Sequence, residues 1–127
     1  FVNPERLGQL QKVHSENFDL SKLIQLCKEL NDSYRSENYF SVAMLARAIL
    51  DHVPPIFGFS KFEQVIGQHG NKSFKGVMEH LDKSLRNIAD SFLHFQIRKQ
   101  EVLPNQNQVN FSADLDVLLA EIVRILK

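Results

Sequence analysis

Apolar residues recur every three or four positions along most of this chain, which is the spacing of a helix with one buried face. The clearest stripe runs from Ser73 to about Ile97 and predicts one long helix there. Its apolar members alternate four and three apart, a strict seam that predicts packing against other helices. They are Phe74, Met78, Leu81, Leu85, Ile88, Phe92 and Phe95.

Three further segments carry the same signal at similar length. One follows Asp19, whose side chain is a good helix N-cap, and reaches about Arg35. The segment 39–53 is apolar on nearly every side, which is typical of the middle of a bundle, and Pro54 stops it. The last segment is capped by Ser112 and continues to the end of the chain.

Two shorter segments, 4–14 and 61–68, predict short helices. No alternating strand pattern, β-hairpin turn or internal repeat is present. We therefore predict an all-α fold, a helical bundle of about four main helices plus one or two short helices. Residues 1–18 would form a lead-in or short helix, and residues 19–127 a single helical bundle domain.

The composition narrows the classes of function. Of the 127 residues, 43% are apolar and 24% are charged, the ordinary globular mixture, and the formal net charge is zero. A strongly basic footprint for nucleic acid is therefore absent from the domain as a whole, which leaves only a local patch open. The one cysteine, Cys27, excludes an internal disulfide and a multi-cysteine zinc site, and its place in an apolar stripe predicts a buried thiol.

We predict no metal site and no cofactor. The chain has no His-x-x-x-His or Glu-x-x-His pair, and no glycine-rich phosphate loop follows a strand. The nearest cluster of possible ligands comprises Glu79, His80 and Asp82, and we expect it to lie on the surface of the long helix.

The ends of the chain and its hydropathy lead to a predicted location. There is no run of about 18 apolar residues and no signal-peptide pattern, so we predict a cytoplasmic protein without membrane contact. The chain begins at Phe1 without an initiating Met, which predicts the C-terminal domain of a longer protein. The upstream domain of that protein would then be one of its partners.

A ladder of polar residues is the most distinctive chemistry of the long helix. Arg86, Asp90 and His94 follow one another four residues apart, and on a helical wheel they fall opposite the apolar seam. One interpretation is a solvated face with a weak intrahelical ion pair, worth about 0.3 kcal/mol. The other is a second, functional face, which Leu93 and Ile97 favour because they are apolar residues on that side.

A second polar pair interrupts the apolar segment 39–53. Arg47 and Asp51 lie one helical turn apart, and an unpaired buried arginine would be very costly. The pair is therefore either a structural ion pair that ties the bundle together or part of a binding site. Arg98 lies close to His94 in the sequence and is followed by Lys99, a small basic patch that is weak evidence for nucleic-acid binding.

Two sequence stretches resemble the signatures of a bacterial family of unknown function in the HEPN superfamily. "LARAILDH", from Leu45 to His52, is similar to the first signature, an apolar helix with Ala-Arg-Ala followed by Leu and an acid. "LRNIADSFLH" is similar to the second, with Arg86, Ile88 and His94 at the family's spacing. The resemblance implies a HEPN-type helical bundle, often dimeric and often fused to other domains.

The resemblance also implies a possible chemistry. Active HEPN ribonucleases use Arg and His, with a polar residue beside the Arg, across a dimer cleft and without metal. Carried over to this chain, Arg86 would bind a phosphate, Asn87 would orient it, and His94 would be the general acid or base for attack by the RNA 2′-hydroxyl. Those enzymes place fewer residues between Arg and His than the seven found here, and Asp90 stands where the phosphate would approach.

These observations give a ranked set of functions. The first is a non-enzymatic HEPN-like module for dimerisation, with a homodimer expected, or for partner binding within a larger bacterial protein. The second is a metal-independent ribonuclease using Arg86 and His94 with Asn87 in support. The third is a nucleotide- or phosphate-binding bundle. The expected binding residues are Arg47, Asp51, Asp90 and Arg98.

Overall fold

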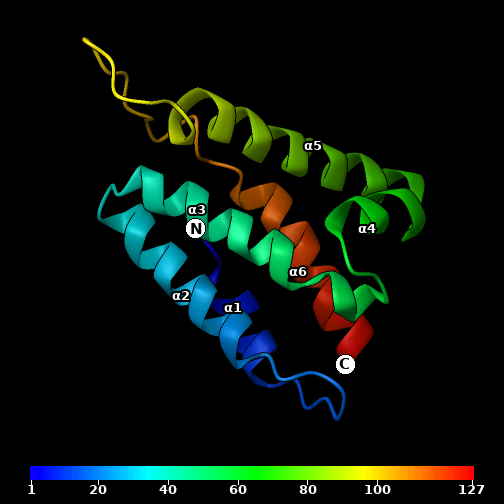
Figure 1. The fold of residues 1–127 in the computed structure, drawn as a ribbon. Helices are drawn as coiled ribbons and strands as arrows, with labels where there is room; N and C mark the ends of the chain where they lie inside the picture. The colour runs from blue at the N-terminus through cyan, green and yellow to red at the C-terminus, as the bar shows by residue number, and fades with distance from the viewer.

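The computed structural model describes residues 1–127 and contains helices but no strands (Figure 1). Four helices are long, and they are α2 (Ser21–Arg35), α3 (Tyr39–His52), α5 (Lys72–Ile88) and α6 (Ser112–Leu126). Two are short, and they are α1 (Pro4–Gln11) and α4 (Phe62–Gln68). A 3-10 turn, Pro54–Phe57, follows α3, and a π turn, Ala89–Leu93, follows α5. The predicted all-α bundle of four main helices with short additional ones is confirmed.

Side chains bind the backbone near several of the helix starts. The Asp19 carboxylate accepts a hydrogen bond from the backbone N–H of Ser21 at 2.9 Å, but the residue that precedes α2 is Leu20, so the prediction of Asp19 as the N-cap was wrong by one residue. The α5 helix begins slightly earlier than the apolar pattern predicts, because Asn71 caps it and accepts from the backbone N–H of Phe74. Ser112 is the first residue of α6 rather than its cap, and its hydroxyl donates to the Asn110 side chain.

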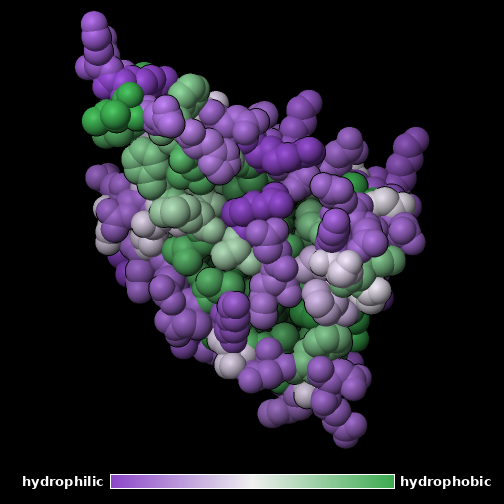
Figure 2. All heavy atoms as spheres, in the orientation of Figure 1, coloured by the Kyte–Doolittle hydropathy of each residue, from purple (hydrophilic) through white to green (hydrophobic).

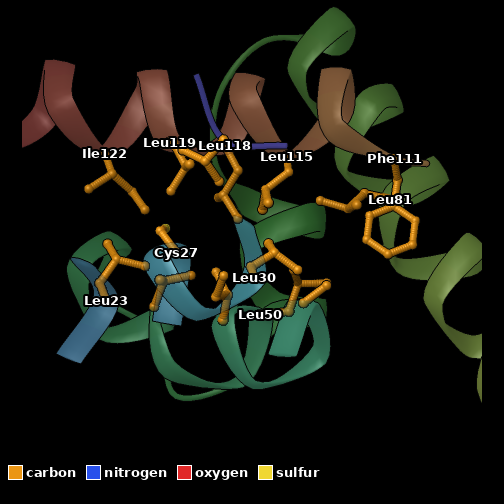
Figure 3. Close-up of a cluster of buried hydrophobic side chains, with 14 of the residues drawn as sticks. Leu23, Cys27, Leu30, Leu50, Leu81, Phe111, Leu115, Leu118, Leu119 and Ile122 are labelled. Carbon is orange, nitrogen blue, oxygen red and sulfur yellow. The ribbon is translucent and has the colours of Figure 1, made fainter. Parts of the chain in front are cut away.

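The core lies where α2, α3, α5 and α6 face one another, and Figure 3 shows side chains from all four helices meeting there. Val2 and Leu10 from the first eighteen residues belong to the same buried cluster. Arg6 ties α1 to α6 through Asp116, with Nε 2.8 Å from Oδ1. Cys27 is fully buried among these side chains, as predicted, and burial raises the pKa of its thiol to about 12.

The long helix ends earlier than the sequence predicts. Regular α geometry stops at Ile88, the π turn follows, and the backbone N–H of His94 donates to the carbonyl of Ala89 at 3.1 Å. Ile88 is still buried in the core, but Phe95 is more than half exposed. The predicted end at Ile97 was wrong because no helix packs opposite the seam at that point, so burial no longer supports helix formation there.

The stretch Tyr39–Phe57, which covers α3 and the 3-10 turn, is long and apolar enough by length and composition to cross a membrane. Its mean hydropathy is 1.3, and 44% of the stretch is buried within the bundle. The core helix of a soluble protein has the same composition, so a single stretch of this kind is weak evidence for a membrane span. The cytoplasmic location stays a prediction.

Candidate functional site

A groove of about 450 Å³ lies between α3 and the C-terminal end of α5, and we call it the α3–α5 groove. Four of the seven residues predicted as catalytic or binding line it, namely Arg47, Arg86, Asp90 and His94. The remaining lining is apolar and comprises Ala43, Met44, Leu85, Ala89 and Leu93. The structure therefore brings together side chains from both signature stretches on one surface.

Asp82 holds the two arginines of this groove in place. It is the one buried charged residue of the chain, with 4% of its surface exposed. Its Oδ1 accepts from Nη1 of Arg47 at 3.1 Å, and its Oδ2 lies 3.1 Å from Nη2 of Arg86. A carboxylate taken out of water is costly unless it is paired and hydrogen-bonded, and two guanidinium groups meet that requirement here.

The expectation that Asp82 lies on the surface was wrong. On the helical wheel it falls at the edge of the apolar seam, directly after Leu81 and four residues before Arg86. The position of Asp82 on the wheel could have indicated an ion pair between helices, because a carboxylate at the edge of a seam can reach a cation on a neighbouring helix. The neighbouring cation, Arg47, could not be identified without knowing that α3 lies beside α5.

The π turn moves His94 closer to the line of Arg86 and Asp90, with which the helical wheel already groups it. Its hydrogen bond closes from residue i+5 to residue i, so each residue turns through a smaller angle than in an α-helix. His94 therefore falls back toward the line of the other two, and all three border the α3–α5 groove. Arg86 forms its intrahelical ion pair with Asp82 rather than with Asp90.

Three predicted residues lie outside the α3–α5 groove. Asn87 is exposed on α5 and does not line it. Asp51 lines a neighbouring groove of about 340 Å³ and pairs with Arg47 at 3.3 Å. Arg98 lies over the Phe95 ring, with its guanidinium carbon 4.3 Å from the ring centroid, and is directed toward its own loop.

The charges of the site largely cancel. Arg47 and Arg86 supply two positive charges, and their neighbours Asp51, Asp82 and Asp90 supply three negative ones, a formal charge of −1 with neutral histidine. Both arginines already have carboxylate partners, so an incoming phosphate would have to displace or tolerate them. The arrangement suits contacts of mixed charge better than the capture of an anion.

The structure contains no group of three or more His, Cys, Asp or Glu side chains placed to hold a metal ion. His80, which was among the nearest sequence candidates, instead pairs through Nδ1 with Asp114 Oδ2 of α6 at 2.5 Å.

A second histidine contact has no sequence signal. His69 Nε2 lies 2.8 Å from Oε2 of Glu121, and its ring packs edge-on against Phe57 and Phe74, with centroids 4.8 and 5.5 Å away. It joins the turn between α4 and α5 to α6, and its partners are too distant in the sequence to be paired by spacing. Arg124 also binds Glu121, and hydrogen bonds from Arg124 and then His69 lower the pKa of that carboxyl.

Comparison of the chain with models of protein families, with curated proteins and with solved structures finds no match. The resemblance to the HEPN superfamily therefore rests on the two signature stretches alone. What it implies for dimerisation and for chemistry stays a prediction.

Proposed function

We propose that the chain is a non-enzymatic HEPN-like helical module that mediates dimerisation for a larger bacterial protein of the cytoplasm. Its interaction surface is the α3–α5 groove, and its partner is a second copy of the chain. The upstream part of the same protein would then carry the activity that the module serves.

The observation that carries the proposal is the character of the groove. Its arginines are already paired with carboxylates, whereas Met44 beside them is 53% exposed and Phe40, one turn earlier on α3, is also exposed. Figure 2 shows apolar side chains gathered over the facing ends of α3 and α5, with hydrophilic side chains beside them. Exposed apolar area next to satisfied charges is typical of a protein interface.

Charge symmetry favours a second copy as the partner. A two-fold axis places the same patch opposite itself, so a charged patch is favourable there only if it carries both signs of charge. The groove meets this condition, because Arg86 retains exposed donors and Asp90 has no ion-pair partner within the chain.

The test is the molar mass in solution, measured by light scattering over a wide concentration range. We expect a dimer for the wild-type chain and a monomer for Met44→Glu, which buries a charge in the interface. Val117→Glu is the matched control, since Val117 is an exposed apolar residue of α6 that does not line the groove, and it should stay dimeric. A wild-type chain that is monomeric throughout would overturn the proposal.

A metal-independent ribonuclease is the second candidate function, and one observation favours it. Arg86 and His94 line the same groove, beside Arg47. Cleavage of RNA would require this closeness, because Arg86 would bind the phosphate while His94 transfers a proton at the neighbouring 2′-hydroxyl. RNA cleavage in the presence of a chelator, lost in both Arg86→Ala and His94→Ala, would establish it. His80→Ala is the matched histidine control, because His80 does not line the groove.

Binding of a nucleotide or phosphate without cleavage ranks third. Arg47 and Arg86 do line one groove, but Asp82 occupies donors of both guanidinium groups. Inorganic phosphate that protects the chain against thermal unfolding, and fails to protect Arg86→Ala, would raise this ranking.

A further inference from the structure

Residues 94–104 leave the bundle after the π turn, and we call this segment the arm. In Figure 1 it is the yellow segment that projects beyond the end of α5. Ile97 is 94% exposed, and three further large apolar side chains of the arm are more than half exposed, namely Phe95, Val102 and Leu103. So dense a set of exposed apolar residues indicates a surface that another protein covers.

The two ends of the arm stay on their own bundle, since His94 lines the α3–α5 groove and Pro104 is buried, whereas residues 95–103 between them are all exposed. No backbone–backbone hydrogen bond involves residues 95–104. Its main internal contacts come from Arg98, which lies over the Phe95 ring and pairs with Glu101 at 3.1 Å. The free backbone groups and apolar side chains are therefore available to a partner.

We propose that the arm of one copy lies in the α3–α5 groove of a second copy, and that the second arm does the same in return. This inference rests on the proposed dimer and names the segment that makes it. The groove is then complete only in the dimer, where the partner's arm covers the exposed Met44 and borders the Arg86–His94 end.

The apolar surfaces of the arm and the groove match in kind and in size. The arm offers four large apolar side chains, and the groove offers Met44, Leu93 and three smaller or more buried apolar positions. Because the arm runs out and back between two points on its own bundle, its eleven residues reach at most roughly 18 Å from it, which exceeds the roughly 6 Å that Ala43 to Arg47 span along α3. In its own chain Ile97 is exposed and does not line the groove.

The charges of the two surfaces are complementary. Arg98 and Lys99 with Glu101 give the arm a formal charge of +1, against −1 for the groove and its paired neighbours. Lys99 has no ion-pair partner in its own chain, and neither does Asp90 at the groove. Exchange of the arms would bring together these two unpaired, opposite charges, one from each copy.

Cross-linking between two differently labelled chains tests the exchange. A chain with Ile97→Cys is mixed with a larger, tagged chain with Met44→Cys and oxidised mildly. We expect a covalent dimer of mixed size, and none when Val117→Cys replaces Met44→Cys. The native Cys27 does not interfere, because it is fully buried.

A charge reversal provides an independent measurement. Lys99→Glu should weaken the dimer roughly fivefold in Kd, since two rim ion pairs are lost per dimer, and Asp90→Lys in the same chain should restore it. A stable wild-type dimer without the mixed cross-link would overturn the exchange of arms and leave the proposed dimer standing. A chain that is monomeric at every concentration would overturn both.

Discussion

The Oδ1 atom of Asp82 accepts a hydrogen bond from Nη1 of Arg47 at 3.1 Å, which joins α5 to α3 across 35 residues of sequence. The same carboxylate binds Arg86 one turn further along α5. One buried acid thus fixes the positions of two of the charged groups that line the α3–α5 groove.

Removal of the Asp82 carboxylate should destabilise the fold. We expect Asp82→Asn to lower the free energy of unfolding by about 1–3 kcal/mol, because two guanidinium groups lose their partner at a buried site. The value stays below that of a fully buried pair, since Arg47 and Arg86 are 43% and 61% exposed. Urea unfolding at a protein concentration low enough to keep the chain monomeric measures the change, with exposed Asp90→Asn as the control expected within about 0.5 kcal/mol of wild type. Equal stability of the two variants would contradict the role of Asp82.

Acid should weaken the contact around Glu121. Hydrogen bonds from Arg124 and His69 lower the pKa of this carboxyl in the folded state, so the unfolded chain binds its proton first as the pH falls. The contribution of Glu121 is therefore complete above its ordinary pKa of 4.5 and is lost as the pH falls through the lower folded-state value. Thermal unfolding at descending pH should show a smaller acid loss for Glu121→Gln than for wild type. Exposed Glu16→Gln should behave like wild type, and an unchanged profile for Glu121→Gln would contradict the prediction.

The thiol of Cys27 should be unreactive in the folded protein. Burial raises its pKa to about 12, so at neutral pH the reactive thiolate is scarce and the reagent has no access to it. Labelling with a thiol reagent should be slow in buffer and fast in urea. Val117→Cys, exposed on α6 and outside both the arm and the groove, provides the fast native control, and native labelling of Cys27 at that rate would show that the α2 core opens readily.

Core and arm leucines should respond very differently to truncation. Leu118 is fully buried on α6, so Leu118→Ala should cost about 2–5 kcal/mol of folding free energy. Leu103 is largely exposed on the arm, and Leu103→Ala should change the stability of the monomer by less than about 0.5 kcal/mol. Chemical unfolding at low protein concentration measures both. A large loss for Leu103→Ala would mean that the arm packs on its own bundle.

The helices could be predicted from the sequence because each long one buries a continuous apolar stripe. The seam of α5 identified Met78, Leu81, Leu85 and Ile88 as core residues, and all four are buried. The same seam predicted too long a helix, since periodicity describes only one surface. Whether a second helix lies opposite Phe95 depends on how the whole chain is folded.

The groove was less accessible to prediction than the helices. Arg86, Asp90 and His94 could be selected from their spacing, and Arg47 from its position in an apolar helix. Their convergence depends on two facts that no single helix reveals, the closeness of α3 to α5 and the π turn after Ile88. The role of Asp82 was not predicted, because a helical wheel places this residue at the edge of the apolar seam but does not show which neighbouring helix contacts that edge.

The π turn also changes how the interval between Arg86 and His94 should be counted. A ring that closes from i to i+5 contains one residue more than a ring of the α-helix, so the turn takes up one residue without a corresponding advance around the axis. Measured around the helix, His94 occupies nearly the place that a residue one position earlier would have on a regular helix. Arg86 and His94 are thus separated by less rotation about the helix axis than their number of intervening residues indicates. A chain lacking one residue of this turn would place its histidine at the same groove.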